Sequence, residues 1–256
     1  MSAHGKKVRL DRAMVDRGLA ESGEKARALV MAGAVSLPGH PGRGRPTPGM
    51  LVAGNQEIAV TSGPRFVSRG GEKLAHALDV FGLNPSGNLA LDIGASTGGF
   101  TDCLLQAGAS RVYAVDVGRG QLHNRLIRDE RVVSMERVNA RNHYEIGELV
   151  DLVVADVSFI SLRLVLPRAI AHLRPGGAAV VLVKPQFEAE PGEVGSGGII
   201  RDSQVHAAIL GRFTQWAVSN GLRLRGLTSS PIRGDKGNRE FLVQLEPARD
   251  GFASNL

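Results

Sequence analysis

Residues 89–99 read Leu-Ala-Leu-Asp-Ile-Gly-Ala-Ser-Thr-Gly-Gly, an apolar run that closes on an acid and enters a glycine-rich turn. A helix-forming stretch follows, and residues 111–116 (Arg-Val-Tyr-Ala-Val-Asp) form a second apolar run that ends on Asp116. Strand, glycine turn, helix and a second strand ending in an acid are typical of a nucleotide-type cofactor site on a doubly wound sheet. The alternative is a glycine turn that only lets the helix pack on the strand.

The spacing of the glycines argues against a dinucleotide. The pyrophosphate fingerprint is G-x-G-x-x-G, whereas Ser96 stands here where the middle glycine belongs. An acid at the strand end, Asp92, followed by G-x-x-x-G fits S-adenosylmethionine better, because that cofactor lacks phosphate and carries an ammonium and a sulfonium. We therefore expect S-adenosylmethionine as the cofactor.

The candidate cofactor-binding residues lie at the ends of four predicted strands. The turn is expected to line the amino-acid end of the cofactor and Asp116 the ribose hydroxyls, while Asn139 is either an adenine contact or an ordinary turn asparagine. The full set is Asp92, Gly94, Ala95, Ser96, Thr97, Gly98, Gly99, Phe100, Asp116, Val117, Asn139 and Asp156.

Composition indicates a cytoplasmic protein with one large and one small domain. The chain has 256 residues, 43% of them hydrophobic, and a single cysteine, Cys103, with no charged-then-apolar leader. No apolar run approaches the ~18 residues of a membrane span. The seven histidines are scattered without ligand spacing, so no metal site is expected.

The positive charge is concentrated near the start of the chain. Residues 1–73 hold 12 Lys and Arg against 6 Asp and Glu, whereas the remaining 183 residues hold 19 of each kind. This asymmetry indicates a surface for a polyanion such as nucleic acid, with a solvated charged face as the alternative. Candidate phosphate contacts, without base readout, are Arg9, Arg12, Lys25, Arg27, Arg43 and Arg45, followed by Arg65 and Arg69.

Two domains are predicted. In residues 1–62, apolar spacing indicates two short helices, and a Pro- and Gly-rich segment separates strands near 34–37 and 57–60. Residues 63–71 form the predicted linker, and residues 72–256 the second domain. The fold class is α/β: a Rossmann-like, mostly parallel sheet with an antiparallel last strand, typical of class I methyltransferases, preceded by a small α+β domain.

Strands and helices alternate in the second domain. After a helix at 72–81, strands are expected near 88–93, 111–116, 132–136, 151–155 and 178–184, and an antiparallel pair near 223–227 and 241–245. Helical stretches are expected near 99–107, 121–129, 160–172 and 203–220.

Charged residues stand at three predicted strand ends. Asp156 and Lys184 close two buried strands, and Glu240 precedes the last strand. Ligands bind beyond the carboxyl ends of such strands, so these residues are candidates for a site. The alternative is a network of salt bridges that holds the strand ends in register.

From Val8 to Leu245, the chain resembles the TlyA family of bacterial ribosomal RNA 2′-O-ribose methyltransferases, some of which carry an older haemolysin label. The blocks that carry the resemblance are Arg9-Leu10-Asp11, VSRGGEKL (67–74), DIGASTGGFTD (92–102), AVDVG (114–118), DVSFISL (156–162), KPQFE (184–188), and SPI (230–232) with GNREFL (237–242).

The resemblance implies an RNA-binding module of the alpha-L type fused to an FtsJ-like catalytic domain. It implies ribosomal RNA or a ribosomal subunit as partner, a cytidine ribose as target, and a catalytic tetrad of Lys73, Asp156, Lys184 and Glu240. In the hypothesis, Lys184 takes or shares the hydroxyl proton, Asp156 positions the hydroxyl, and Lys73 with Glu240 orients the ribose. The module departs from the family pattern at Ser22-Gly23 and Pro38-Gly39.

Three other functions compete with this interpretation. A base methyltransferase would suit the acid and aromatic of residues 156–159, but the prolines of an amino-group methylase are missing, and Cys103 is expected in the core rather than as a nucleophile. A non-catalytic RNA-binding ribosome-assembly factor is the second alternative. A membrane-active haemolysin is the third alternative, and the sequence argues against it because it shows no membrane span and no strongly amphipathic exposed helix.

Overall fold

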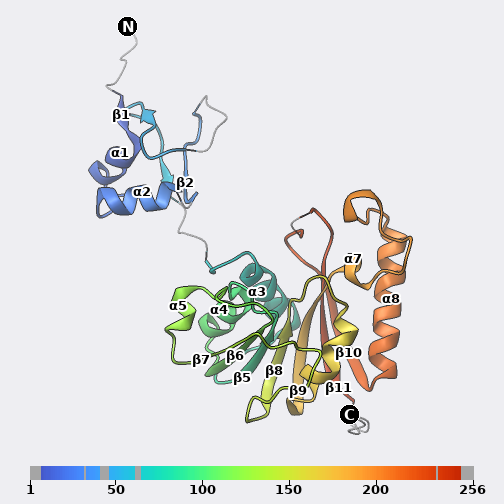
Figure 1. Ribbon diagram of the computed structural model, residues 1–256. Helices are drawn as coiled ribbons and strands as arrows, with labels where there is room; N and C mark the ends of the chain where they lie inside the picture. The colour runs from blue at the N-terminus through green and yellow to red at the C-terminus, as the bar shows by residue number, and fades with distance from the viewer. Residues whose placement is uncertain (1–6, 32, 41–45, 61–64, 235, 249–256) are drawn as a thin grey trace. The chain divides into compact units, whose positions relative to one another are not determined.

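A computed structural model describes residues 7–31, 33–40, 46–60, 65–234 and 236–248. The chain forms two compact units, Met1–Arg65 and Phe66–Leu256 (Figure 1). Each unit has its own apolar core.

The first unit contains two helices and two small antiparallel ladders. Helices α1 (Leu10–Asp16) and α2 (Gly23–Met31) agree with the predicted pair. Strand β2 (Val35–Ser36) pairs with β4 (Ala59–Val60), at the places where two strands are expected. Strands β1 (Val8–Arg9) and β3 (Leu51–Val52) form a second ladder, which was not predicted because two residues carry no period-two pattern. The core consists of Leu10, Ala13, Met14, Ala26, Val30, Val35, Val52 and Ile58.

The second unit is built on a seven-stranded sheet with the order β10-β11-β9-β8-β5-β6-β7. The five strands from β9 to β7 run parallel, and β11 is antiparallel to both of its neighbours. The predicted fold class is therefore confirmed, including the antiparallel last strand. The strands are β5 (Leu89–Ile93), β6 (Arg111–Asp116), β7 (Val132–Glu136), β8 (Val150–Ala155), β9 (Leu173–Val183), β10 (Leu222–Ser229) and β11 (Phe241–Pro247).

Helices cover both faces of this sheet, as the alternation of its side chains requires (Figure 1). In β5, Ala90 belongs to one apolar cluster while Leu91 and Ile93 belong to the other. The Ala90 cluster includes side chains of α3 (Gly70–Phe81), α4 (Gly99–Gln106) and α5 (Asn124–Ile127). The opposite cluster includes side chains of η1 (Leu162–Leu164), α6 (Leu166–Ile170) and α8 (Ser203–Ser219). Two short helices, α7 (Pro185–Glu188) and η2 (Ser196–Gly198), lie between β9 and α8.

Several boundaries differ from the predicted ones. Phe66 is buried in the second unit and α3 begins at Gly70, so most of the predicted linker belongs to the second unit. The expected helix 160–172 is divided at Val165, because Pro167 starts a new helix and cannot continue an earlier one. The helix expected at 121–129 is reduced to α5, and β9 begins at Leu173, earlier than expected.

Gly71→Ala is expected to destabilise the second unit, although alanine normally favours a helix. A Cβ at position 71 would lie 2.2 Å from Cγ of Phe66, so the ring that anchors the start of this unit must shift. Overpacking of this kind costs about 1–3 kcal/mol. Thermal and urea unfolding of the purified chain would measure the change.

Gly211→Ala in α8 is the matched control, because a Cβ there meets nothing within 4 Å. Helix propensity alone predicts that this variant is stabilised by about 1 kcal/mol. A Gly71→Ala variant as stable as the Gly211→Ala variant would contradict the packing argument.

Candidate active site

The turn after β5 has a backbone that only small residues permit. Gly94 and Gly98 have φ values of +80° and +91°, and Cβ atoms there would lie 2.6 Å from the Asp156 carbonyl oxygen and 2.2 Å from Leu126 Cδ1. Ser96 also has positive φ, at 49°. Its backbone N–H donates to Oδ2 of Asp116 at 2.7 Å, so the acid at the end of β6 holds the turn in place.

A pocket of about 550 Å³ lies beside this turn. Asp116 borders it, and its second oxygen, Oδ1, accepts a 2.7 Å hydrogen bond from the Gly118 N–H. Six of the predicted cofactor-binding residues line this pocket: Gly94, Ser96, Asp116, Val117, Asn139 and Asp156.

A second pocket, of about 260 Å³, shares Gly94, Ser96, Asp156 and Ser158 with the first. Its wall also contains Ala95, Thr97, Gly99 and Phe100 from the predicted cofactor set. All four residues of the predicted tetrad line it, from four different places in the chain: Lys73 in α3, Asp156 after β8, Lys184 after β9 and Glu240 before β11.

The tetrad forms two lysine–carboxylate pairs, of which Lys73–Glu240 is buried and Lys184–Asp156 is partly buried. Nζ of Lys73 lies 2.5 Å from Oε2 of Glu240, and Nζ of Lys184 lies 2.6 Å from Oδ1 of Asp156. Lys184 also donates to Oγ of Ser158 at 2.7 Å. Each amine is thus paired with its own acid, and Arg69 is a further cationic side chain on the wall of this pocket. Salt bridges at the strand ends are what the alternative interpretation, a network that holds the strands in register, predicts. Here all four side chains also line a pocket.

Asp92 lies beneath the turn and lines neither pocket. Its side chain is fully buried; Oδ2 accepts from Thr101 Oγ1 at 2.6 Å, and Oδ1 has no hydrogen-bond partner among the described residues. Burial raises the pKa of Asp92 to about 7, and the nearby Asp156 and Asp116 act in the same direction.

The donor set suits S-adenosylmethionine. Two carboxylates, Asp116 and Asp156, border the larger pocket, and Arg141 is the cationic side chain among its lining residues. Acids favour a ligand that carries an ammonium and a sulfonium, whereas a pyrophosphate would require donors and cations at the turn. The residues present therefore fit this cofactor. Among the described residues, there is no group of three or more His, Cys, Asp or Glu side chains that could hold a metal ion.

The predicted RNA-binding residues lie in several settings. Arg9 is engaged through Nε and Nη2 with Asp11, whose pKa is lowered by this contact, and Arg12 lies 3.8 Å from Asp16. Lys25 and Arg27 lie exposed on α2. Arg65 ends the first unit, whereas Arg69 lines the smaller pocket. Arg43 and Arg45 lie outside the described residues.

Phe159 is a site residue that the sequence reasoning did not select. Its side chain is 88% exposed, its φ is +64°, and it lines the larger pocket. Its ring centroid lies 5.2 Å from that of Phe187, which follows Lys184 by three residues. A phenylalanine in left-handed backbone and in water is costly, and such features cluster at functional sites. Phe159 belongs to the block DVSFIS (156–161), but nothing in that block indicates that its ring is exposed.

Sheet order, glycine turn and two adjoining pockets together define a Rossmann-like methyltransferase. The family model described as FtsJ-like methyltransferase matches residues 66–246. The chain belongs to the FtsJ-like methyltransferase family, and the predicted resemblance to TlyA is confirmed by its relatives.

Two curated relatives and one solved structure illustrate the similarity. YqxC of Bacillus subtilis (strain 168), provisionally named an rRNA methyltransferase, is 46% identical over 96% of this chain and 88% of its own length. The 16S/23S rRNA (cytidine-2′-O)-methyltransferase TlyA of Mycobacterium tuberculosis (strain H37Rv) is 42% identical over 96% and 92%. A structure from Streptococcus thermophilus, provisionally named a hemolysin, has a TM-score of 0.72 at 44% identity and covers 95% of this chain and 89% of its own.

The hemolysin name raises the question of a membrane segment. In the described parts of the chain, every helix is too short or too polar to cross a bilayer.

Asp92→Asn is expected to flatten the pH dependence of stability between about pH 4 and pH 7. Because folding raises the pKa of this acid, the folded chain binds its proton more tightly, and stability decreases as pH rises through this window. The rise from 3.8 to about 7 corresponds to a loss on the order of 4 kcal/mol, which the variant lacks. Urea unfolding across the window would measure both slopes, and equal slopes would contradict the burial effect.

Proposed function

We propose that the chain is an S-adenosylmethionine-dependent methyltransferase that acts on the 2′-hydroxyl of a ribose in ribosomal RNA. The observation that carries the proposal is the pair of lysine–carboxylate contacts, Lys184–Asp156 and Lys73–Glu240, on the wall of a pocket that adjoins the glycine turn. A hydroxyl nucleophile needs proton removal and precise orientation but no covalent intermediate on the protein.

The larger pocket is proposed to hold the nucleoside part of the cofactor. Asp116 would bind the ribose hydroxyls, Asn139 and Val117 would contact the adenine, and residues 94–100 would surround the amino-acid end, with Asp92 supporting the turn from below. When bound, S-adenosylmethionine supplies an electrophilic methyl group. Asp156 belongs to both pockets, which would put the acceptor hydroxyl beside that methyl group.

Lys184 is proposed to accept the proton of the hydroxyl. Its Nζ is fixed by two contacts, to Asp156 and to Ser158, so the amine points along one direction. In its neutral amine form, Lys184 would take the hydroxyl proton while the methyl group passes from the sulfonium sulfur to the ribose oxygen, which would leave the cofactor as a neutral thioether. Asp156 would then stabilise the ammonium form of Lys184. The Lys73–Glu240 pair, on the same pocket wall, is proposed to orient the ribose.

The substrate class rests on charge and on the relatives. Residues 1–62 are proposed as the RNA-binding domain because the excess positive charge lies in residues 1–73. The name of the Mycobacterium tuberculosis relative specifies cytidine in 16S and 23S rRNA, so we propose a cytidine ribose as the target. With such a substrate, the chain would act in the cytoplasm and would bind ribosomal subunits or their RNA.

Lys184→Ala is expected to abolish methyl transfer while the dissociation constant of S-adenosylmethionine stays within about threefold, because Lys184 does not line the larger pocket, which is proposed to hold the nucleoside part of the cofactor. Transfer of a labelled methyl group to ribosomal subunits, calorimetry of cofactor binding and mapping of 2′-O-methylated positions would measure this. Full transfer activity in the variant would remove the proposed role. RNA binding without transfer in the wild-type chain would favour the assembly-factor alternative.

Phe159→Ala is expected to raise the KM for RNA roughly tenfold and to leave cofactor affinity nearly unchanged. An exposed ring at the pocket rim offers a stacking surface for a base, and such stacking contributes about 1–3 kcal/mol per base. Phe159→Trp, which keeps an aromatic face, is the matched control and should retain a KM near the wild-type value. Steady-state kinetics with ribosomal subunits would separate the variants; equal KM values for both would contradict stacking.

A further inference from the structure

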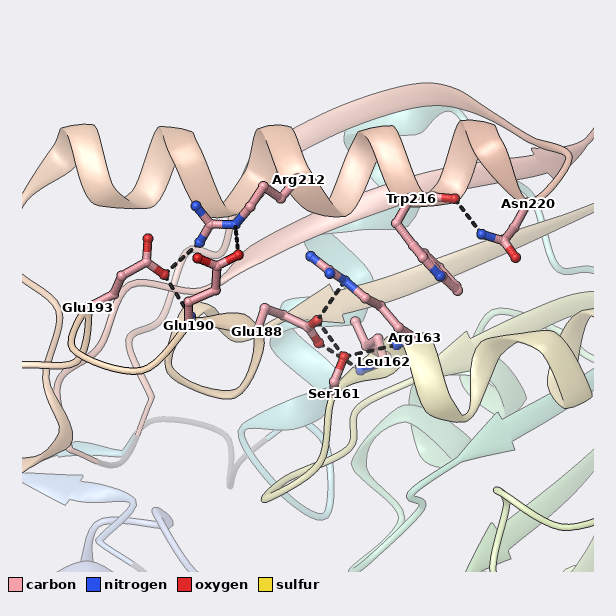
Figure 2. Close-up of polar contacts among 9 residues, drawn as sticks. All are labelled: Ser161, Leu162, Arg163, Glu188, Glu190, Glu193, Arg212, Trp216 and Asn220. Carbon is pink, nitrogen blue, oxygen red and sulfur yellow. Dashed lines mark hydrogen bonds and ion pairs between the residues drawn. The ribbon is translucent and has the colours of Figure 1, made fainter.

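Glu188 connects two loops that leave neighbouring strands of the sheet. It is the last residue of α7, four positions after Lys184, and it reaches the loop that follows β8. Its Oε2 accepts a 2.7 Å hydrogen bond from Ser161 Oγ, and its Oε1 accepts one of 2.7 Å from the Leu162 N–H (Figure 2). Arg163 Nε lies 3.6 Å from Oε2. Both oxygens are therefore directed at the first turn of η1.

The carboxylate of Glu188 is buried, so it depends on the donors of the 156–162 loop and of Arg163. The side chain of Glu188 is 1% exposed, and burial raises its pKa, while the two hydrogen bonds and Arg163 act in the opposite direction. A buried carboxylate is costly unless several donors surround it. Its removal leaves the Ser161 hydroxyl and the Leu162 amide without their acceptor, so the loop loses its fixed end.

The loop of residues 156–162 is thus held at both ends by residues of one short segment. Lys184 contacts Asp156 and Ser158 at its beginning, and Glu188 holds Ser161 and Leu162 at its end. Phe159 lies between these two points, with positive φ and an exposed ring. Two fixed ends are a physical reason for the loop to keep a conformation that a free chain avoids.

We propose that Glu188 is a positioning residue for methyl transfer: by fixing the end of the 156–162 loop, it sets the placement of Asp156 and Phe159 relative to Lys184. The inference rests on the proposed function of that site. Glu188 lines neither pocket, so it acts through the loop and not by contact with the reacting groups. A misplacement of about 1 Å can reduce a rate roughly 100-fold.

Two nearby glutamates offer a matched contrast. Glu190 and Glu193 contact Arg212 of α8, at 3.5 Å and 2.5 Å, whereas Glu188 contacts the start of η1 (Figure 2). They belong to the same segment as Glu188 and carry the same charge, but they join it to a helix on the face of the sheet. The side chain of Glu190 is 67% exposed, and Arg212 keeps its contact with Glu193 when Glu190 is truncated.

The kinetic test compares Glu188→Ala, Glu188→Gln and Glu190→Ala. Glu188→Ala is expected to lower kcat for ribosomal subunits at least tenfold, with the cofactor dissociation constant within about threefold of wild type. Glu188→Gln should keep most of kcat, because its amide oxygen accepts from Leu162 N–H and its NH₂ group donates to the Ser161 hydroxyl, which can rotate to accept. Glu190→Ala should stay within about twofold. Should Glu188→Ala fail to fold, Ser161→Ala removes one of the two Glu188 hydrogen bonds, together with the bond from the Arg163 N–H to Ser161 Oγ, and is expected to lower kcat about threefold or more.

Amide hydrogen exchange without cofactor or RNA gives a readout that does not depend on catalysis. The Leu162 amide should exchange faster in Glu188→Ala than in the wild-type chain or in Glu190→Ala, and slowly again in Glu188→Gln. Unchanged exchange and unchanged kcat in Glu188→Ala would overturn the inference, as would a Gln variant as impaired as the Ala variant. If the wild-type chain itself transfers no methyl group to RNA, the proposed function fails, while faster exchange would still show that Glu188 fixes the loop.

Discussion

Two lysine amines are buried beside the carboxyl ends of the parallel strands, and each must lie against a carboxylate. A buried, unpaired ammonium costs several kcal/mol, so the structure is constrained to bring Asp156 to Lys184 and Glu240 to Lys73. The order β11-β9-β8-β5 meets this constraint, because it places the ends of β8 and β9 and the start of β11 near the helix α3. These two pairs connect α3 with the segment before β11, and the end of β9 with the loop after β8, around the smaller pocket.

Carboxylates dominate the rest of the site. Asp116 holds the glycine turn through Ser96, and Asp92 lies under that turn with a raised pKa. A turn made of backbone N–H groups with acids around it would repel a phosphate, yet it suits a cationic nucleoside. The pockets therefore differ from a dinucleotide site in charge, although the underlying sheet has the same architecture.

Local features of the sequence could be predicted well, and contacts between distant segments could not. The sequence predicts the turn after β5, and it predicts Asp116, Asp156 and Lys184 as strand-end residues. Each of these features lies within a few residues of the strand that positions it. Lys73 stands inside a helix 167 positions from its partner, and only the family resemblance indicated it. The exposure of Phe159 and the burial of Glu188 depend on how two loops meet. Neither apolar periodicity nor local propensity contains that information.

The antiparallel direction of β11 has a consequence for the order in which the protein becomes complete. Parallel strands bring their C-terminal ends to the site, whereas β11 brings its beginning, with Glu240 just before Phe241. Until residue 240 has left the ribosome, Lys73 of the nascent chain has no Glu240 as counter-ion, and β9 has no β11 beside it. The smaller pocket therefore lacks one of its two carboxylates until residue 240 has been synthesised, late in translation of the second unit.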